Sequence, residues 1–308
     1  MKGRILKILK DKAGVVSGQA LSTELGISRV AVWKHIQKLQ ALGYDIDAST
    51  RGYRLNHSPD VPYPWEFPGR ESKIVYYQEL PSTMDAAKDL ARKDCPHFTT
   101  VIAGRQTSGR GRLQREWISE RGGLYFTMVL RPDLPPVLSF RVSFLASVTL
   151  AGILNEVFGI DARVKWPNDI LVDERKISGM LSELEAEADR VAFINIGVGI
   201  NVNNDPPMTQ SPTTSLKKLL GRTVSKIDLL GRYLATLENR MRTTAFDGII
   251  AEWKQYTVTL NRDVRVVTAH EVVEGKAVDV DDSGALILQG ADGSLKKILY
   301  GDCFHQSH

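Results

Sequence analysis

The segment from Gly104 to Trp117 constrains this chain more than any other. It follows a strand-like run at Thr100 to Ala103 and precedes another at Leu124 to Leu130, which indicates a loop between two buried strands. Four arginines lie among its glycines: Arg105, Arg110, Arg112 and Arg115. Cations this close repel one another, so the arrangement is costly unless an anion neutralises them.

Phosphate is the anion that such a loop suits best. Glycine lets backbone N–H groups approach an anion, and arginine can grip phosphate or carboxylate oxygens through two parallel hydrogen bonds. Gly109 and Gly111 are not followed by a glycine at Gln114, and no G-K-[S/T] occurs, so neither a Rossmann site nor a P-loop is expected. A solvated, flexible basic loop is the alternative interpretation.

Further short motifs accompany this loop in a definite order. They are Ser82-Thr83, then Lys165-Trp166-Pro167-Asn168-Asp169, then Arg175-Lys176-Ile177-Ser178-Gly179-Met180-Leu181, and finally Gly197-Val198-Gly199-Ile200-Asn201. Together with the loop they resemble the biotin–protein ligases, and the resemblance covers essentially the whole chain. The N-terminal segment resembles that of the bifunctional members, which also repress the biotin operon.

Length and composition are those of an ordinary globular protein. The 308 residues, 43% hydrophobic and 25% charged, are enough for two or three domains. No apolar run approaches the roughly 20 residues that cross a bilayer, and the N-terminus lacks a signal core, so we expect a cytoplasmic protein without membrane contact. Cys95 and Cys303 are too few for a disulfide framework, and no ligand-spaced cluster predicts a protein-bound metal.

Positive charge is concentrated at the N-terminus. Residues 1 to 55 carry ten Lys or Arg against four Asp or Glu, a net charge of +6, whereas the whole chain carries +4. The remainder therefore has a net charge of −2. Such a distribution is typical of a module that binds a polyanion such as DNA.

Residues 1 to 56 are predicted to form a winged helix-turn-helix domain. Apolar residues between positions 5 and 9 indicate a first helix, Ser17 caps a second, and Ser28 caps a third from Arg29 to Leu39. A hairpin with its turn at Ser49 to Gly52 supplies the wing.

The third helix is expected to enter a groove of operator DNA. Val32, Ile36 and Leu39 share its inward face, which leaves polar residues outside. The expected DNA-binding residues are Ser28, Arg29, Lys34, His35, Lys38 and Arg51. Trp33 is interpreted as a packing aromatic. A winged helix that binds another protein is the alternative.

Three further segments complete the expected α+β architecture. Four prolines between Asn56 and Pro68 preclude a helix or a central strand and predict a linker over residues 57–72. A mixed α/β catalytic domain of the biotin/lipoate ligase type is expected at residues 73–260, with an apolar core helix from Ser139 to Val157. The strand pattern near the C-terminus, with the resemblance, implies a small SH3-like β barrel at residues 261–308.

The resemblance implies an ATP-dependent reaction that forms biotinyl-adenylate, with Mg²⁺ on the phosphates, and passes biotin to a lysine of the biotin carboxyl carrier protein. The implied catalytic residues are Lys176, Arg112, Arg110 and Asp169. The implied biotin-binding residues are Ser82, Thr83, Gln106, Gly109, Arg110, Lys176, Met180, Leu181, Gly197 and Gly199. The implied ATP-binding residues are Arg112, Arg115, Trp117, Asn168, Lys176 and Asn201.

Each of these motifs also has a structural interpretation. Ser82 and Thr83 are by default helix caps, Lys176 by default snorkels outward, and the glycines Gly197 and Gly199 by default mark a bulge. Two positions depart from the family pattern. Met84 replaces an asparagine, and Gln114 replaces a glycine where positive φ is expected.

We expect the loop to be disordered when empty and to close over the intermediate with Trp117 as an apolar lid. By resemblance, dimers form by pairing of the central sheets, and the ligand-ordered loop contributes to that surface, so a homodimer is expected when biotinyl-adenylate is bound. The alternatives are a DNA-binding biotin sensor with little ligase activity and a lipoate-type acyl ligase on the same fold.

Overall fold

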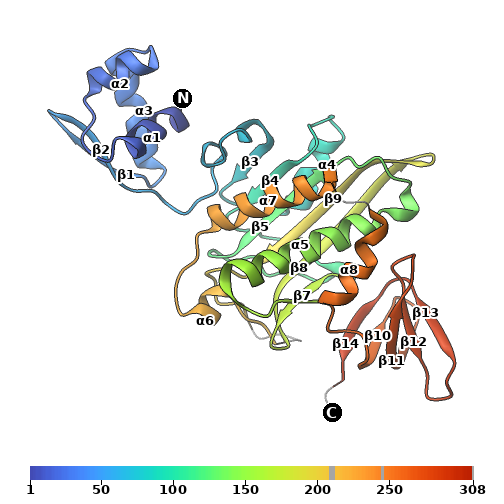
Figure 1. Cartoon of the computed structure of the whole chain (residues 1–308). Coiled ribbons are helices and arrows are strands. Elements are labelled where there is room, and N and C mark those ends of the chain that lie inside the picture. Colours follow the sequence, from blue (N-terminus) through green and yellow to red (C-terminus); the bar gives the residue numbers. More distant parts are fainter. Residues whose placement is uncertain (208–211, 244–245, 307–308) are drawn as a thin grey trace. The chain divides into compact units, whose positions relative to one another are not determined.

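The structure, a computed structural model, describes residues 1–207, 212–243 and 246–306 (Figure 1). The chain divides into two compact units, Met1–Glu71 and Ser72–His308. The first is helical with a small hairpin, and the second carries a mixed sheet and a smaller antiparallel sheet. This is the α+β arrangement that the sequence predicts.

The first unit has the expected helix-turn-helix order. Its elements are α1 (Lys2–Asp11), α2 (Gly18–Leu25), α3 (Arg29–Ala41), β1 (Asp45–Ser49) and β2 (Gly52–His57). Ser17 caps α2 by accepting a hydrogen bond from the N–H of Ala20 at 3.1 Å. Ser28 caps α3 in the same way through Ala31 at 3.2 Å. Each cap stabilises its helix by about 1 kcal/mol.

The wing is fastened to the helices by a close backbone approach at Gly52. This residue pairs with Ser49 across the hairpin turn and has a φ of +140°. A Cβ at Gly52 would lie 2.2 Å from the carbonyl oxygen of Val16, so only glycine fits. The approach lets Val16 and Tyr53 exchange two backbone hydrogen bonds, of 2.8 and 2.9 Å.

The segment expected as a linker, residues 57–72, packs onto the first unit. It contains the 3-10 turn η1 (Pro64–Glu66). Tyr63 and Trp65 stack with ring centroids 4.8 Å apart and pack against the core, and the indole N–H of Trp65 donates to the Tyr44 hydroxyl at 2.8 Å. Prolines exclude helix and central strand but do not exclude packing. The division between the units falls at the end of this segment.

A seven-stranded sheet forms the centre of the second unit, in the order β3-β4-β5-β9-β8-β7-β6. The strands are β3 (Ile74–Tyr77), β4 (Thr99–Ala103), β5 (Leu124–Leu130), β6 (Arg163–Lys165), β7 (Asp169–Val172), β8 (Arg175–Glu187) and β9 (Arg190–Ile200). β3 and β4 are parallel, and the other pairs are antiparallel. The arginine-rich loop therefore connects two buried strands, β4 and β5, as predicted, and the structure shows that these strands are neighbours in the sheet.

Helices cover both faces of this sheet. The remaining helices of the described chain are α4 (Thr83–Ala91), α5 (Phe140–Phe158), α6 (Leu216–Leu220), α7 (Lys226–Thr243) and α8 (Ile249–Tyr256). The remaining 3-10 turns are η2 (Glu71–Lys73), η3 (Arg112–Gln114), η4 (Pro136–Leu138) and η5 (Phe246–Gly248). Side chains alternate along a strand, so Phe126 and Thr127 of β5 point to opposite faces. Thr127 is hydrogen-bonded to Thr83 of α4 at 2.9 Å, whereas Phe126 packs on Tyr233 of α7 at 5.8 Å between centroids. α4 and α7 therefore lie on opposite faces.

The helix α5 is a core helix, and it ends at Gly159 with φ +64°, as predicted. We expected no apolar run of membrane-spanning length. The helical segment Pro136–Phe158 is nevertheless long and apolar enough to cross a membrane, judged by length and composition alone. However, 61% of the most apolar 18-residue stretch of this segment is buried inside the protein. Phe144 stacks on Trp253 of α8 with ring centroids 4.8 Å apart. Its apolar character is accounted for by this packing.

The C-terminal segment forms a five-stranded antiparallel sheet in the order β13-β12-β11-β10-β14. The strands are β10 (Asp263–Val267), β11 (Val272–Val280), β12 (Leu286–Gln289), β13 (Leu295–Ile298) and β14 (Asp302–His305). The first three correspond to the strands that the sequence predicts at Arg262 to Val267, Glu274 to Val280 and Ala285 to Gln289. β14 lies beside β10, which brings the last strand of the chain to the edge that borders the candidate site.

Candidate active site and DNA-binding helix

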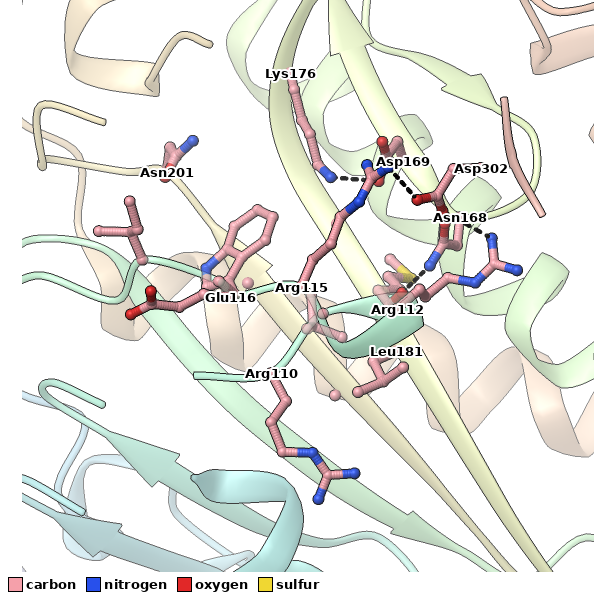
Figure 2. Close-up of a pocket in the computed structure, with 18 of the residues that line it drawn as sticks. Arg110, Arg112, Arg115, Glu116, Asn168, Asp169, Lys176, Leu181, Asn201 and Asp302 are labelled. Carbon is pink, nitrogen blue, oxygen red and sulfur yellow. Dashed lines mark hydrogen bonds and ion pairs between the residues drawn. The ribbon is translucent and has the colours of Figure 1, made fainter. Parts of the chain in front are cut away.

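A cavity of about 500 Å³ lies on the α4 side of the seven-stranded sheet (Figure 2). Its walls come from β5, β8 and β9, from the start of α4, from the arginine-rich loop, from the turn before β7 and from β14. Segments far apart in the sequence thus meet there. All the residues implied to bind biotin or ATP line the cavity except Gly109, which lies within the loop and accepts a hydrogen bond from the N–H of Trp117 at 2.9 Å.

One end of the cavity is a network of polar side chains. The amide oxygen of Gln106 accepts hydrogen bonds from the N–H and the hydroxyl of Thr83, at 2.8 and 3.0 Å. Gln106 Nε2 donates to Ser119 at 2.8 Å, and Thr127 donates to Thr83. Ser82 caps α4 and is buried beside them. A polar ring can exchange hydrogen bonds with such groups, whereas an alkyl chain offers them no hydrogen bond in place of water.

Glycines form the floor beneath Trp117. Gly179 and Gly199 are register partners on β8 and β9. A Cβ at Gly199 would lie 2.3 Å from Trp117 Cε2, and a Cβ at Gly179 would lie 2.8 Å from Trp117 Cζ3. Both glycines are therefore needed for the indole to reach the sheet. The Trp117 N–H is buried without a partner among the described residues, so it is available to a ligand.

Lys176 lies five residues before Leu181 on β8, whereas Thr127 of the polar network is level with Leu181, so the lysine is at the other end of the cavity. Figure 2 shows Lys176 beside Asp169. Its ammonium nitrogen is 2.7 Å from Asp169 Oδ1 and 5.1 Å from the centroid of the Trp117 ring. The side chain therefore points into the cavity and does not snorkel outward. An ammonium held between a carboxylate and an aromatic face is placed to meet an anionic ligand.

Two loop arginines meet the C-terminal sheet at this end. Arg115 Nη2 lies 2.9 Å from Asp302 Oδ2, and its guanidinium carbon is 5.4 Å from the Phe304 ring centroid. Arg112 donates to the carbonyl of Gly301 at 2.9 Å. Burial lowers the pKa of the Arg112 guanidinium, and the neighbouring carboxylates oppose that shift. The loop thus brings two cations to the end of the cavity that holds Lys176.

Arg110 does not join this group. It points away from Lys176 in Figure 2 and pairs with Asp85 of α4 and Glu183 of β8. In the structure the arginine therefore holds the loop to α4 and β8, and its implied role in catalysis and biotin binding stays a prediction.

The four loop arginines are neutralised by the protein itself, contrary to the expectation that only an added anion would do so. Arg105 pairs with Glu79 at 3.1 Å and with Glu120 at 3.3 Å. Asp302, in the C-terminal sheet, forms ion pairs with both Arg112 and Arg115. These carboxylates lie outside the loop, so the loop composition by itself overstates the repulsion.

The loop backbone folds back on itself across the cavity. Gly111 donates its N–H to the carbonyl of Arg115 at 2.8 Å, and Trp117 is tied to Gly109. The positive φ that we placed at Gln114 falls instead on Leu113, at +49°. The turn therefore forms with its left-handed residue one position earlier than the family pattern implies.

Two of the implied ATP-binding residues are hydrogen-bonded to other residues of the protein. The side-chain amide of Asn168 donates to the carbonyl of Met180, and the Met180 N–H returns a bond to the Asn168 carbonyl at 3.0 Å. Asn201 is buried and accepts from Asn204 Nδ2 at 3.0 Å. Leu181 and Met180 form an apolar part of the cavity wall. Met84 also packs there, its methyl carbon 2.8 Å from where a Cβ on Gly197 would stand.

Several cavity residues were not anticipated from the sequence. They are Thr127, Lys165, Asp302, Cys303 and Phe304. Lys165 belongs to a quoted motif, and its ammonium lies 5.7 Å from the Phe304 ring centroid. Thr127 lies in a strand that otherwise reads as apolar, and its hydroxyl is the one signal that could have drawn attention to it.

On the first unit, α3 presents cations to solvent as predicted. Arg29, Lys34 and Lys38 are exposed, as is Arg51 at the hairpin turn, and none of the four has an ion-pair partner within the described part of the chain. His35 is half-buried, and burial lowers its pKa, with Lys38 adding to the effect. His35 is therefore less available to a groove than we expected.

The interpretation of Trp33 as a packing aromatic is wrong. Its side chain is 47% exposed, on the outer face of α3. Val32 and Ile36 already fill the inward face and are fully buried, and Trp33 stands about 100° around the helix from Val32.

Comparison with protein families gives matches to three segments of the chain. Residues 76–201 match the biotin/lipoate A/B protein ligase family, residues 3–54 match a helix-turn-helix domain, and residues 259–306 match the biotin protein ligase C-terminal domain. The fold and the cavity are thus those of a biotin/lipoate-type protein ligase that carries an N-terminal helix-turn-helix domain.

Whole-chain relatives narrow this class. The "bifunctional ligase/repressor BirA" of Bacillus subtilis (strain 168) is 37% identical over 302 residues, which cover 93% of each chain. The protein of the same name from Escherichia coli (strain K12) is 27% identical over 93% of this chain and 91% of its own. The biotin protein ligase of Aquifex aeolicus in complex with biotin and ATP superposes with a TM-score of 0.64 at 26% identity, over 76% of this chain and 99% of that one. The chain belongs to the family of bifunctional biotin–protein ligase/repressors.

Proposed function

We propose that the protein joins biotin to ATP, transfers the biotinyl group to a lysine of the biotin carboxyl carrier protein of acetyl-CoA carboxylase, and represses biotin synthesis genes as a dimer. One observation carries the ligase part. Lys176, Arg112 and Arg115 meet at one end of a cavity whose other end is the polar network around Thr83 and Gln106. Such a cavity suits a ligand with a polar ring at one end and a carboxylate at the other.

The chemistry requires positive charge that is already in place. A carboxylate is a poor acyl donor, so a carboxylate oxygen of biotin first attacks the α-phosphorus of ATP, and pyrophosphate leaves with the electron pair of the broken bond. Both reactants are anions, and Lys176 and Arg112 offset their repulsion, with Asp169 positioning Lys176. The carrier lysine then attacks the carbonyl carbon of the mixed anhydride, AMP leaves, and the amine gives up a proton.

Magnesium would be brought to this site by the ATP phosphates. No group of three His, Cys, Asp or Glu in the described ranges could hold a metal ion. The cavity carboxylates Asp169 and Asp302 are each paired with a cation. Mg²⁺ commonly binds substrate phosphates, one or two carboxylates and several waters, so Asp169, Asp302 and Glu116, which all line the cavity, are the carboxylates that would meet it. Bound there, it neutralises phosphate charge.

The activated intermediate must be kept from water until the carrier arrives. Trp117 brings an apolar ring into the cavity by packing on Gly179 and Gly199, and the pairs of Arg110 with Asp85 and Glu183 hold the loop against α4 and β8. Arg110, which also lines the cavity, therefore holds the loop in place.

The test is a reconstituted reaction. Protein, biotin, MgATP and a biotin carrier domain should give a product labelled on one lysine, seen by mass spectrometry, and omission of ATP should abolish it. Octanoate or lipoate in place of biotin should give no product, because neither can pair with the polar network. If the protein binds biotin by calorimetry but labels no carrier, it is a sensor without ligase activity and the proposal is wrong.

Gly199→Ala is expected to prevent the loop from closing. In the parent protein, biotin with MgATP should slow trypsin cleavage after the loop arginines, whereas in the variant the added methyl occupies the space of the Trp117 indole. Overpacking of this kind costs about 1–3 kcal/mol, so adenylate formation should fall about tenfold or more. Gly248→Ala places its methyl in open space and serves as the control. Equal protection of the loop in Gly199→Ala and the parent would contradict the role given to Trp117.

A further inference from the structure

The outer face of α3 carries two apolar side chains that the protein core does not use. Val30 is 61% exposed and Trp33 is 47% exposed, while Val32, Ile36 and Leu39 on the inner face are fully buried. Residues three apart lie on the same side of a helix, so Val30 and Trp33 are neighbours on that outer face. We call these two residues the apolar pair of α3.

The surroundings of the apolar pair are positively charged. Arg29 and Lys34 flank it, and Lys38 lies one turn further along, all exposed. The sequence of α3 contains no Asp or Glu. None of these three cations forms an ion pair with any residue that the structure describes. The partner of this face must therefore bring both negative charge and an apolar group.

The major groove of DNA offers that combination. Its walls are phosphates, and the C5-methyl group of thymine is the apolar feature that base pairs present there. Val30 and Trp33 are the second and fifth residues of α3, in the half of a recognition helix that contacts base edges. A protein partner would need a larger apolar area, because two side chains bury too little to hold one.

We propose that Val30 and Trp33 determine sequence specificity by contacting thymine C5-methyl groups in the operator, while Arg29 and Lys34 contact the phosphates beside them. This inference rests on the proposed repressor function and adds to it the chemistry that the helix recognises. Each methyl contact replaces exposed apolar surface by buried surface on both molecules.

The experiment removes single methyl groups from the DNA. The full-length protein with biotin and MgATP is used to select a high-affinity duplex from a random library, and each thymine of that duplex is then replaced in turn by deoxyuridine. Burial of one methyl group corresponds to about a fourfold change in affinity. We expect a loss of that size at one or more thymines of each half-site for the parent protein.

Substitutions in the protein assign these effects to residues. Val30→Ala and Trp33→Ala should each bind the selected duplex more weakly and should each lose the response to deoxyuridine at particular thymines. Val137→Ala changes a valine that is 72% exposed in the second unit, and it should keep the parent's full response. Circular dichroism melting shows whether the α3 variants keep the fold.

The outcomes separate the inference from the function beneath it. If the parent protein selects a duplex but is indifferent to every thymine methyl group, the inference is overturned and the repressor function stands. The inference also fails if Val30→Ala and Trp33→Ala keep the parent's response to deoxyuridine, or lose affinity equally for all duplexes. If the library yields no preferred duplex, the repressor function fails, and the inference fails with it.

Discussion

Lys176→Ala is expected to slow biotinyl-adenylate formation by about 10²- to 10³-fold, with a much smaller change in biotin affinity. The ammonium lies 2.7 Å from Asp169 at the end of the cavity where the loop arginines converge, whereas the polar network around Gln106 lies at the other end. Removal of Lys176 therefore takes charge from the reacting centre and leaves the ring-binding groups in place. Pyrophosphate release in single-turnover experiments measures the rate, and calorimetry measures biotin binding.

Controls separate this electrostatic role from a structural one. Lys217→Ala removes an exposed lysine of α6 and should leave both measurements unchanged. Asp169→Asn removes the partner of Lys176 but keeps its ammonium, and it should slow the reaction less than Lys176→Ala. Thermal unfolding shows whether each variant is folded. Adenylate formation by Lys176→Ala at the parent rate would remove this residue from the mechanism.

The elements most accurately predicted from the sequence are those with local signals. Ser17 and Ser28 cap the helices that follow them, because a hydroxyl at the N-cap position accepts a hydrogen bond from an otherwise unpaired N–H of the first turn. Gly159 ends α5 because it accepts a left-handed φ without strain. The strand from Leu124 to Leu130 has the bounds expected from its apolar run.

What the sequence could not predict depends on contacts between distant segments. Asp302 reaches Arg115 because β14 pairs with β10, and no local pattern specifies which carboxylate will meet a given arginine. Arg110 turns outward for the same reason, since its partners lie on α4 and β8. The residues implied by the short motifs line one cavity, apart from Gly109, but the motifs do not specify which of these side chains pair with each other.

Trp33 is a different case, because its exposure follows from the helical period. A helix that buries every third or fourth residue from Val32 to Leu39 has no place on its inward face for the intervening tryptophan. The prediction failed because an aromatic side chain was assumed to pack. Periodicity should have outweighed that assumption.

Removal of residues 1–71 is expected to abolish operator binding while leaving ligase activity near the parent level. The truncation removes one compact unit, which has its own core. The remaining chain begins just before β3 of the other unit. The net charge of +6 on residues 1 to 55 and the exposed cations of α3 are lost with it. Fluorescence anisotropy with DNA from upstream of the cell's own biotin synthesis genes measures binding, and carrier labelling measures activity.

In the full-length protein, operator affinity is expected to rise when biotin and ATP are added. One winged helix makes few phosphate contacts, so tight binding requires two copies on a two-fold related site. If closure of the arginine-rich loop over biotinyl-adenylate favours the dimer, then the ligand and the DNA must favour each other by the same free energy, and DNA should strengthen ligand binding in return. A dimer with six or more phosphate contacts should lose about 10³-fold or more in affinity between about 50 and 200 mM salt. Operator affinity that stays constant across biotin concentrations that saturate the ligase site would show that the cavity does not control the helix-turn-helix domain.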